Sequence, residues 1–170
     1  MQQSFSTDRL FLDTVTTEDH DFMMALTNSK GWLQFIGDRN IHSKEDAIAY
    51  INKILDYPNF TYWVIRLREI NLPIGVISFI KRDYLPHYDI GFALLPKYSG
   101  QGYAFEAAKE VLLEAVQHPE HSVILASTLP ENSSSIHLLE KLGFVFDRDQ
   151  QVGNDSLHVY TADRSQLLKL

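Results

Sequence analysis

Residues 94–104 read Leu94-Leu95-Pro96-Lys97-Tyr98-Ser99-Gly100-Gln101-Gly102-Tyr103-Ala104 and run directly into the helix-forming residues 105–113. An apolar run thus meets a loop with two glycines, and the loop opens a helix. Such a junction presents backbone N–H groups at the positive end of a helix dipole. The stretch therefore predicts a binding site for a phosphate group.

The composition is that of an ordinary globular chain. Its 170 residues are 45% hydrophobic and 22% charged, which predicts a single domain spanning residues 1–170. The net charge of −7 argues against direct nucleic-acid binding, because neutralising phosphates needs basic patches. An acidic chain suits a cationic substrate, but the same charge also serves solubility alone.

Several kinds of site are excluded by what the chain lacks. With no cysteine it has no disulfide, no thiolate zinc site and no cysteine nucleophile. No spacing of histidines and acids indicates a metal site. Residues 1–9 are too polar for a signal peptide, and no run approaches the ~20 apolar residues of a membrane span. We expect a cytoplasmic protein without a membrane partner.

The first half of the chain predicts one strand, two helices and three strands. The expected strand at 10–15 is followed by a helix from Thr16 to about Thr27, with Asp19 completing a capping box. A second box at Ser43 opens the next helix. The three further strands are expected at 61–67, 74–80 and 88–95, with a turn at 71–73 between the first two.

The second half predicts a helix at 102–116, a strand at 122–129, a helix at 133–142 and strands at 144–146 and 157–161. Asn132 is the expected N-cap of the second of these helices, and Gly143 its C-terminal glycine. The elements follow one another as strand, two helices, three strands, helix, strand, helix and two strands. This order predicts an α/β fold, a mixed sheet with helices on its faces.

Two motifs resemble the GNAT family, the GCN5-related N-acetyltransferases. In the family's loop, Arg/Gln-x-x-Gly-x-Gly/Ala, Gly102 and Ala104 fill the last two positions, while Ser99 departs from the usual Arg or Gln. Residues 130–144, from Pro130 to Phe144, resemble the family's Asn-x-x-Ser…Glu-Lys-Leu-Gly-Phe segment. The opening at 7–12 is most similar to the branch that acetylates ribosomal-protein N-termini.

The resemblance implies acetyl-CoA as the acetyl donor. It places the donor's pyrophosphate on the loop residues Ser99, Gly100, Gln101, Gly102, Tyr103 and Ala104. It places the pantetheine arm along the backbone of Phe92 and Leu94 and against Asn132. A backbone N–H near Leu94 is expected to stabilise the oxyanion of a tetrahedral intermediate. Each residue also has a plain structural interpretation: core burial for Phe92 and Leu94, and helix capping for Asn132.

Ser135 is the candidate general acid for the departing CoA thiolate. Most of the family places a tyrosine four residues further along, where this chain has Leu139. The branch that resembles this opening instead uses a serine at the Ser135 position. The alternative is an ordinary serine in the first turn of a helix.

The general base is the open role. One branch of the family uses a glutamate where this chain has Ser127, which cannot act as the base. Asp89, at the start of the strand before the pyrophosphate loop, is one candidate, and its alternative role is a strand-edge acid or salt-bridge partner. Asp149 and Asp155 are further candidates. An α-amine with a pKa of ~7.7 is about one-sixth neutral at pH 7, whereas a lysine amine is about 0.04% neutral. An α-amine therefore needs little help from a base, so the missing glutamate favours an α-amine over a lysine as the acceptor.

The expected function is transfer of an acetyl group from acetyl-CoA to a primary amine, either a protein N-terminus or a small molecule. A non-catalytic acyl-CoA-binding module is the alternative, because Ser99, Ser127 and Leu139 depart from the family pattern. A nucleotide phosphotransferase fits the sequence poorly, because the Walker-type loop is absent. The oligomeric state expected from the sequence is a monomer or a homodimer.

Overall fold

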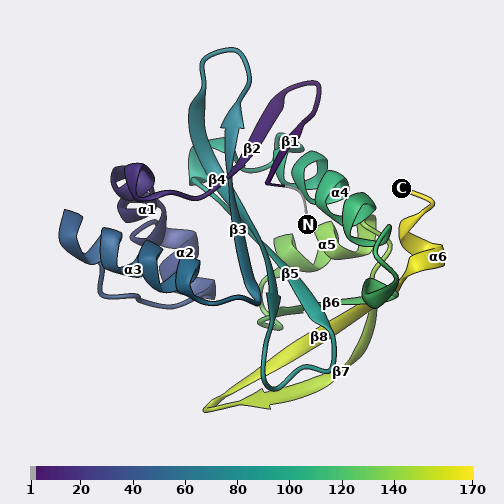
Figure 1. Ribbon diagram of the computed structural model, residues 1–170. Helices are drawn as coiled ribbons and strands as arrows, with labels where there is room; N and C mark the ends of the chain where they lie inside the picture. The colour runs from purple at the N-terminus through teal and green to yellow at the C-terminus, as the bar shows by residue number, and fades with distance from the viewer. Residues whose placement is uncertain (1–2) are drawn as a thin grey trace.

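The computed structural model describes residues 3–170 and places eight strands in one mixed sheet of order β1-β2-β3-β4-β5-β6-β8-β7 (Figure 1). Neighbouring strands are antiparallel except β5 and β6, which are parallel. The strands are β1 Ser4–Ser6, β2 Leu10–Thr14, β3 Phe60–Leu67, β4 Leu72–Lys81, β5 Tyr88–Leu94, β6 Val123–Thr128, β7 Val145–Val152 and β8 Asp155–Asp163.

Helices cover both faces of the sheet (Figure 1). One face carries α1, α2 and α3, whose buried side chains pack with Val64 and Val76. The other face carries α4 and α5, which pack over the larger core around Trp63, Ile77 and Phe144. The helices are α1 His20–Thr27, α2 Lys30–Phe35, α3 Lys44–Asp56, α4 Tyr103–Ala115, α5 Ser133–Lys141 and α6 Arg164–Leu167. Within residues 3–170 no helix combines the length and apolarity that a membrane span requires.

Local chemistry sets the helix ends. The Asn132 side chain accepts a hydrogen bond from the Ser135 N–H at 3.2 Å, so it is the N-cap of α5 as expected. Gly143 follows α5 at φ +82°, the left-handed conformation that glycine adopts without a Cβ clash. Ser43 caps α3 by accepting a hydrogen bond from the Asp46 N–H at 3.1 Å, and the Asp46 carboxylate accepts from the His42 N–H at 3.0 Å.

The predicted order of elements is confirmed, with three short additions. The sequence analysis missed β1, α2 and α6, which have three, six and four residues. The predicted turn at 71–73 is wrong in part, because β4 already begins at Leu72. Pro73 is tolerated in that strand because it pairs with Arg66 at an irregularity in the register.

Candidate active site

Strand β5 has one open edge in the middle of the sheet. It pairs with β6 at a single position, Asp89 with Leu125, and the two parallel strands are unpaired beyond it. Residues 91–94 of β5 are only half-buried, whereas residues 74–80 of the neighbouring strand β4 are fully buried. The interior of the sheet is therefore accessible along this edge.

The open edge presents main-chain hydrogen-bonding groups. Leu95 N–H donates to Ile74 O at 2.8 Å, and hydrogen-bonded pairs alternate along an antiparallel ladder. Ala93 and Gly91 therefore turn toward β4, and Phe92 and Leu94 direct their N–H and C=O groups to the open side. An extended chain with amide groups, such as a pantetheine arm, can pair with them as an additional strand.

The loop after β5 meets the requirements of a phosphate site. Gly100 has φ +74° and Gly102 has φ +82°, and both residues are exposed. Glu106 N–H is bonded to Gly102 O at 3.0 Å as the first bond of α4, so the N–H groups of residues 103–105 precede the helix ladder. Those groups converge at the positive end of α4, where a pyrophosphate fits.

Glu106 ties this loop to the start of β2. Its carboxylate accepts from Thr7 Oγ1 at 2.5 Å, from Arg9 N–H at 3.0 Å and from Arg9 Nε at 2.6 Å. Burial by itself raises the pKa of the Glu106 carboxyl, but these hydrogen bonds outweigh it and hold the pKa below its ordinary value. The carboxylate is therefore ionised and fully engaged at neutral pH.

The first turn of α5 carries Asn132 and Ser135, both half-buried. The Asn132 Oδ1 is used for capping, and its amide N–H groups remain for a second contact. Leu139, in the usual position of the tyrosine acid, is 1% exposed and belongs to the core. A hydroxyl for the departing thiolate can therefore come from Ser135 and not from that position.

Asp89 is a buried carboxylate at the point where β5 and β6 part. It is 2% exposed, and Arg82 Nε donates to both of its oxygens at 3.0 and 2.9 Å. Ser127 Oγ lies 3.4 Å from Asp89 Oδ2. Burial raises the pKa of Asp89, while the Arg82 charge and hydrogen bond lower it; the net direction is upward.

The Asp89 side chain lies on the face covered by α1–α3. The side chains of β5 alternate between faces, and Ala93 packs with the α1–α3 cluster while Phe92 packs with the α4–α5 cluster. Tyr62 of β3 joins Ala93 in the first cluster, and burial raises the pKa of its phenol above its usual range. Trp63, the next residue of β3, is a fully buried core residue of the opposite face.

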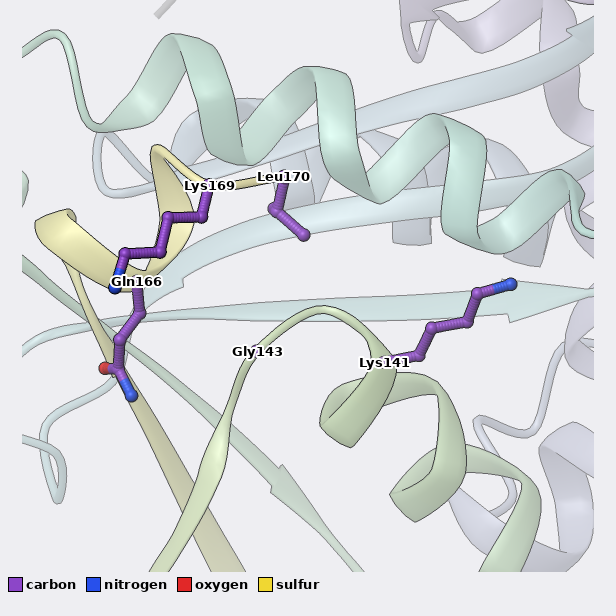
Figure 2. Close-up of a pocket in the computed structure, with 5 residues that line it drawn as sticks. All are labelled: Lys141, Gly143, Gln166, Lys169 and Leu170. Carbon is purple, nitrogen blue, oxygen red and sulfur yellow. The ribbon is translucent and has the colours of Figure 1, made fainter.

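A separate hollow of about 310 Å³ lies between the end of α5 and the C-terminal segment (Figure 2). It is lined by Lys141, Gly143, Gln166, Lys169 and Leu170. Figure 2 shows the two lysine ammonium groups pointing away from each other, and the Lys141 Nζ lies 4.5 Å from the centre of the Phe105 ring. The hollow therefore does not converge positive charge on a ligand.

No metal centre is apparent in the described part of the chain, residues 3–170, where no group of three histidines, aspartates or glutamates is close enough to hold an ion.

Asp149, one of the alternative bases, lies in β7 with its Oδ1 3.4 Å from His158 Nε2. Asp155 is exposed at the start of β8.

Comparison with known proteins identifies the family. Residues 9–145 match the family model described as an acetyltransferase (GNAT) domain. The chain belongs to the GNAT acetyltransferase family. It is thus an N-acetyltransferase, and its GNAT domain takes acetyl-CoA as the acetyl donor.

One curated relative is an uncharacterized N-acetyltransferase, YnaD of Bacillus subtilis, 29% identical over 138 residues, or 81% of this chain and 80% of YnaD. Among solved structures, spermidine N-acetyltransferase from Vibrio cholerae in complex with CoA and spermine superposes with a TM-score of 0.79 at 18% identity, covering 95% of this chain and 99% of that one. RimL, a ribosomal L7/L12 α-N-protein acetyltransferase in complex with coenzyme A, superposes with a TM-score of 0.79 at 15% identity, covering 92% of this chain and 95% of that one.

These findings confirm the fold and the acetyltransferase family predicted from the sequence. The structure also brings Phe92, Leu94 and the loop at 99–104 onto one continuous path, because the loop follows directly from the open edge of β5. Sequence reasoning missed Arg82, the partner of Asp89. The only signal for it was a basic residue in the turn before β5.

Proposed function

We propose that this enzyme transfers the acetyl group of acetyl-CoA to the α-amine at the N-terminus of a peptide. The observation that carries the proposal is the pair formed by Asp89 and Ser127, which lies where the donor edge of β5 meets the face covered by α1–α3. When bound, acetyl-CoA supplies an acetyl group activated as a thioester. Its pyrophosphate is assigned to residues 99–104, and its pantetheine to the backbone of Phe92 and Leu94 and the Asn132 amide.

Asp89 is too buried to meet an amine directly. Ser127 is half-buried, so its hydroxyl is the accessible end of the pair. As the amine nitrogen bonds to the acyl carbon, the amine gives a proton to Ser127 Oγ, and the Ser127 O–H proton passes to Asp89 Oδ2. The upward shift of the Asp89 pKa makes the carboxylate a better proton acceptor than an exposed aspartate.

Ser135 is assigned to the leaving group. As the bond between the acyl carbon and sulfur breaks, the sulfur takes negative charge, and the Ser135 O–H donates to it. Solvent returns the proton to Ser135. Asn132 holds this serine in place, since its side chain caps the turn that carries Ser135.

The ion pair with Arg82 favours an acceptor that needs little help to lose its proton. Arg82 opposes the upward shift of the Asp89 pKa, so the carboxylate remains a weaker base than lysine or a polyamine. An α-amine is already partly neutral at pH 7, whereas lysine and polyamine nitrogens are almost fully protonated. The N-terminal motif supports the same choice, because it resembles the branch that modifies ribosomal-protein N-termini. A small amine is the second candidate, supported by the spermidine N-acetyltransferase neighbour.

The test is a panel of acceptors assayed for release of the CoA thiol. It contains short peptides with free N-termini, the same peptides with blocked N-termini and an internal lysine, and polyamines. The proposal expects turnover with free N-termini and little with the blocked peptides. Turnover with polyamines alone would move the assignment to small amines. CoA binding without turnover on any acceptor would favour the non-catalytic module.

A further inference from the structure

Arg9, at the junction between residues 7–8 and β2, contacts the pyrophosphate loop from outside. Its Nη1 donates to Gln101 O at 3.0 Å, and its guanidinium carbon lies 4.5 Å from the centre of the Tyr103 ring. Both contacts are with loop residues assigned to the donor. Residues more than 90 positions apart in the sequence thus form one local structure.

The position of the Arg9 side chain is fixed on both sides. Glu106 accepts from the backbone N–H and from Nε of Arg9, and Thr7 Oγ1 donates to the same carboxylate. The guanidinium donates from Nε to Glu106 and from Nη1 to Gln101 O, and these two bonds in different directions orient its plane in a way that a lysine ammonium cannot reproduce.

These contacts do not use the second terminal nitrogen of the Arg9 guanidinium, Nη2. Among residues 3–170 no acceptor is found for Arg9 Nη2, and a Cβ placed on Gly102 would lie 3.3 Å from it. Nη2 is therefore beside the glycine whose neighbours present the helix N–H groups. The Arg9 side chain is 46% exposed, so this arm is open to a ligand on the loop.

The position of Arg9 also bears on the residue at which the loop differs from the family pattern. Ser99 stands where the family usually has Arg or Gln, and its short side chain brings no cation to the pyrophosphate. We propose that Arg9 completes the pyrophosphate site: it holds residues 101–103 in their binding conformation and donates from Nη2 to a pyrophosphate oxygen. This inference rests on acetyl-CoA being the donor and is independent of the acceptor.

The test measures binding of three ligands to Arg9→Gln: CoA, 3′-dephospho-CoA, which keeps the pyrophosphate, and pantetheine, which has no phosphate. A lost charge-assisted hydrogen bond predicts affinities about tenfold or more lower for CoA and 3′-dephospho-CoA. Pantetheine affinity is expected to be unchanged. Arg9→Lys, which keeps the charge but not the planar fork, is expected to lie between the native chain and Arg9→Gln.

Arg68→Gln is the matched control. Arg68 Nη1 donates to Thr7 O at 3.0 Å and its guanidinium lies over the Phe11 ring, so it binds the same segment without touching the loop. Arg68→Gln is expected to bind all three ligands as the native chain does. Equal losses for pantetheine and CoA in Arg9→Gln, no loss for CoA, or a loss for CoA but not for 3′-dephospho-CoA would each overturn the proposal. None of these measurements needs an acceptor, so they are separate from the test of the α-amine.

Discussion

The two sides of β5 offer a ligand different kinds of chemical group. On the proposed donor side, the groups available to a ligand are main-chain N–H and C=O groups of Phe92, Leu94 and the glycine loop. On the side covered by α1–α3, the groups we propose to be reactive are side chains that meet through the fold, such as Asp89 and Ser127. The donor site thus depends on backbone shape, whereas the acceptor side depends on which side chains come together.

This difference explains why one chain can share its donor with a large family and still have its own acceptor. A backbone site tolerates changes of side chain, as Ser99 shows. A site made of side chains changes with each substitution.

The largest effect is expected from Asp89→Asn on the acceptor side. Losing the final proton acceptor should lower kcat about a hundredfold, the lower end of general-base effects, with CoA affinity nearly unchanged. Asp19→Asn is the control, since Asp19 is 7% exposed and forms the equivalent ion pair with Arg66. Both variants should lose roughly 3 kcal/mol of stability, the usual result of breaking a buried pair, but Asp19→Asn should keep its kcat. Equal kcat losses would show that Asp89 acts only through stability.

Gly102→Val alters the donor side. A β-branched residue at φ +82° is strained, and its side chain approaches Arg9 Nη2 and the loop N–H groups. The free loop can relieve this strain by leaving its binding conformation, and restoring that conformation for CoA at a cost of about 2 kcal/mol should lower the affinity roughly thirtyfold. Gly153→Val has a similar strain, at φ +58° with open space around it, but lies in the turn between β7 and β8. Isothermal titration should show a loss in the first variant and none in the second.

Ser135→Ala separates chemistry from donor binding. Removing the hydroxyl that donates to the departing sulfur should lower kcat about tenfold, the value of one hydrogen bond to a charged group. The Asn132 cap uses the backbone N–H of Ser135, so the helix and CoA affinity should be preserved. Ser134→Ala, in the same turn and exposed, is the control. An unchanged kcat in Ser135→Ala would assign this serine to structure alone.

The smallest effect concerns the link between Glu106 and residues 7–9. The pKa of Glu106 is lowered from 4.5, so its stabilising contribution is complete above pH 4.5 and is lost as the pH falls through the folded-state value. Glu106→Gln should therefore be less stable at pH 7 by below about 1 kcal/mol, because the carboxylate is partly exposed. Thermal melts should show the gap closing on acidification. A gap that is constant down to acid pH would contradict this account.

The parts that were predictable from the sequence are those with local chemistry. Two glycines before a helix and an asparagine three residues before Ser135 specify the loop and the cap within a few residues. The strands that build the sheet also follow from their own composition.

The rest depends on contacts between distant segments or on elements too short for periodicity. The Asp89–Ser127 pair joins positions 38 apart, and the Arg9–Glu106 pair joins positions 97 apart. Helix α2 has six residues and buries only Trp32, so it shows no repeating apolar pattern.

Hydrogen exchange of the β5 amides, resolved by NMR with and without CoA, tests the central claim most directly. The Phe92 and Leu94 N–H groups face the open edge, while the Gly91 and Ala93 N–H groups already face β4. CoA should slow exchange at Phe92, Leu94 and residues 100–104, and should leave the odd-numbered amides of β5 nearly unchanged. If CoA binds and the Phe92 and Leu94 amides exchange as before, the open edge of β5 is not the donor site.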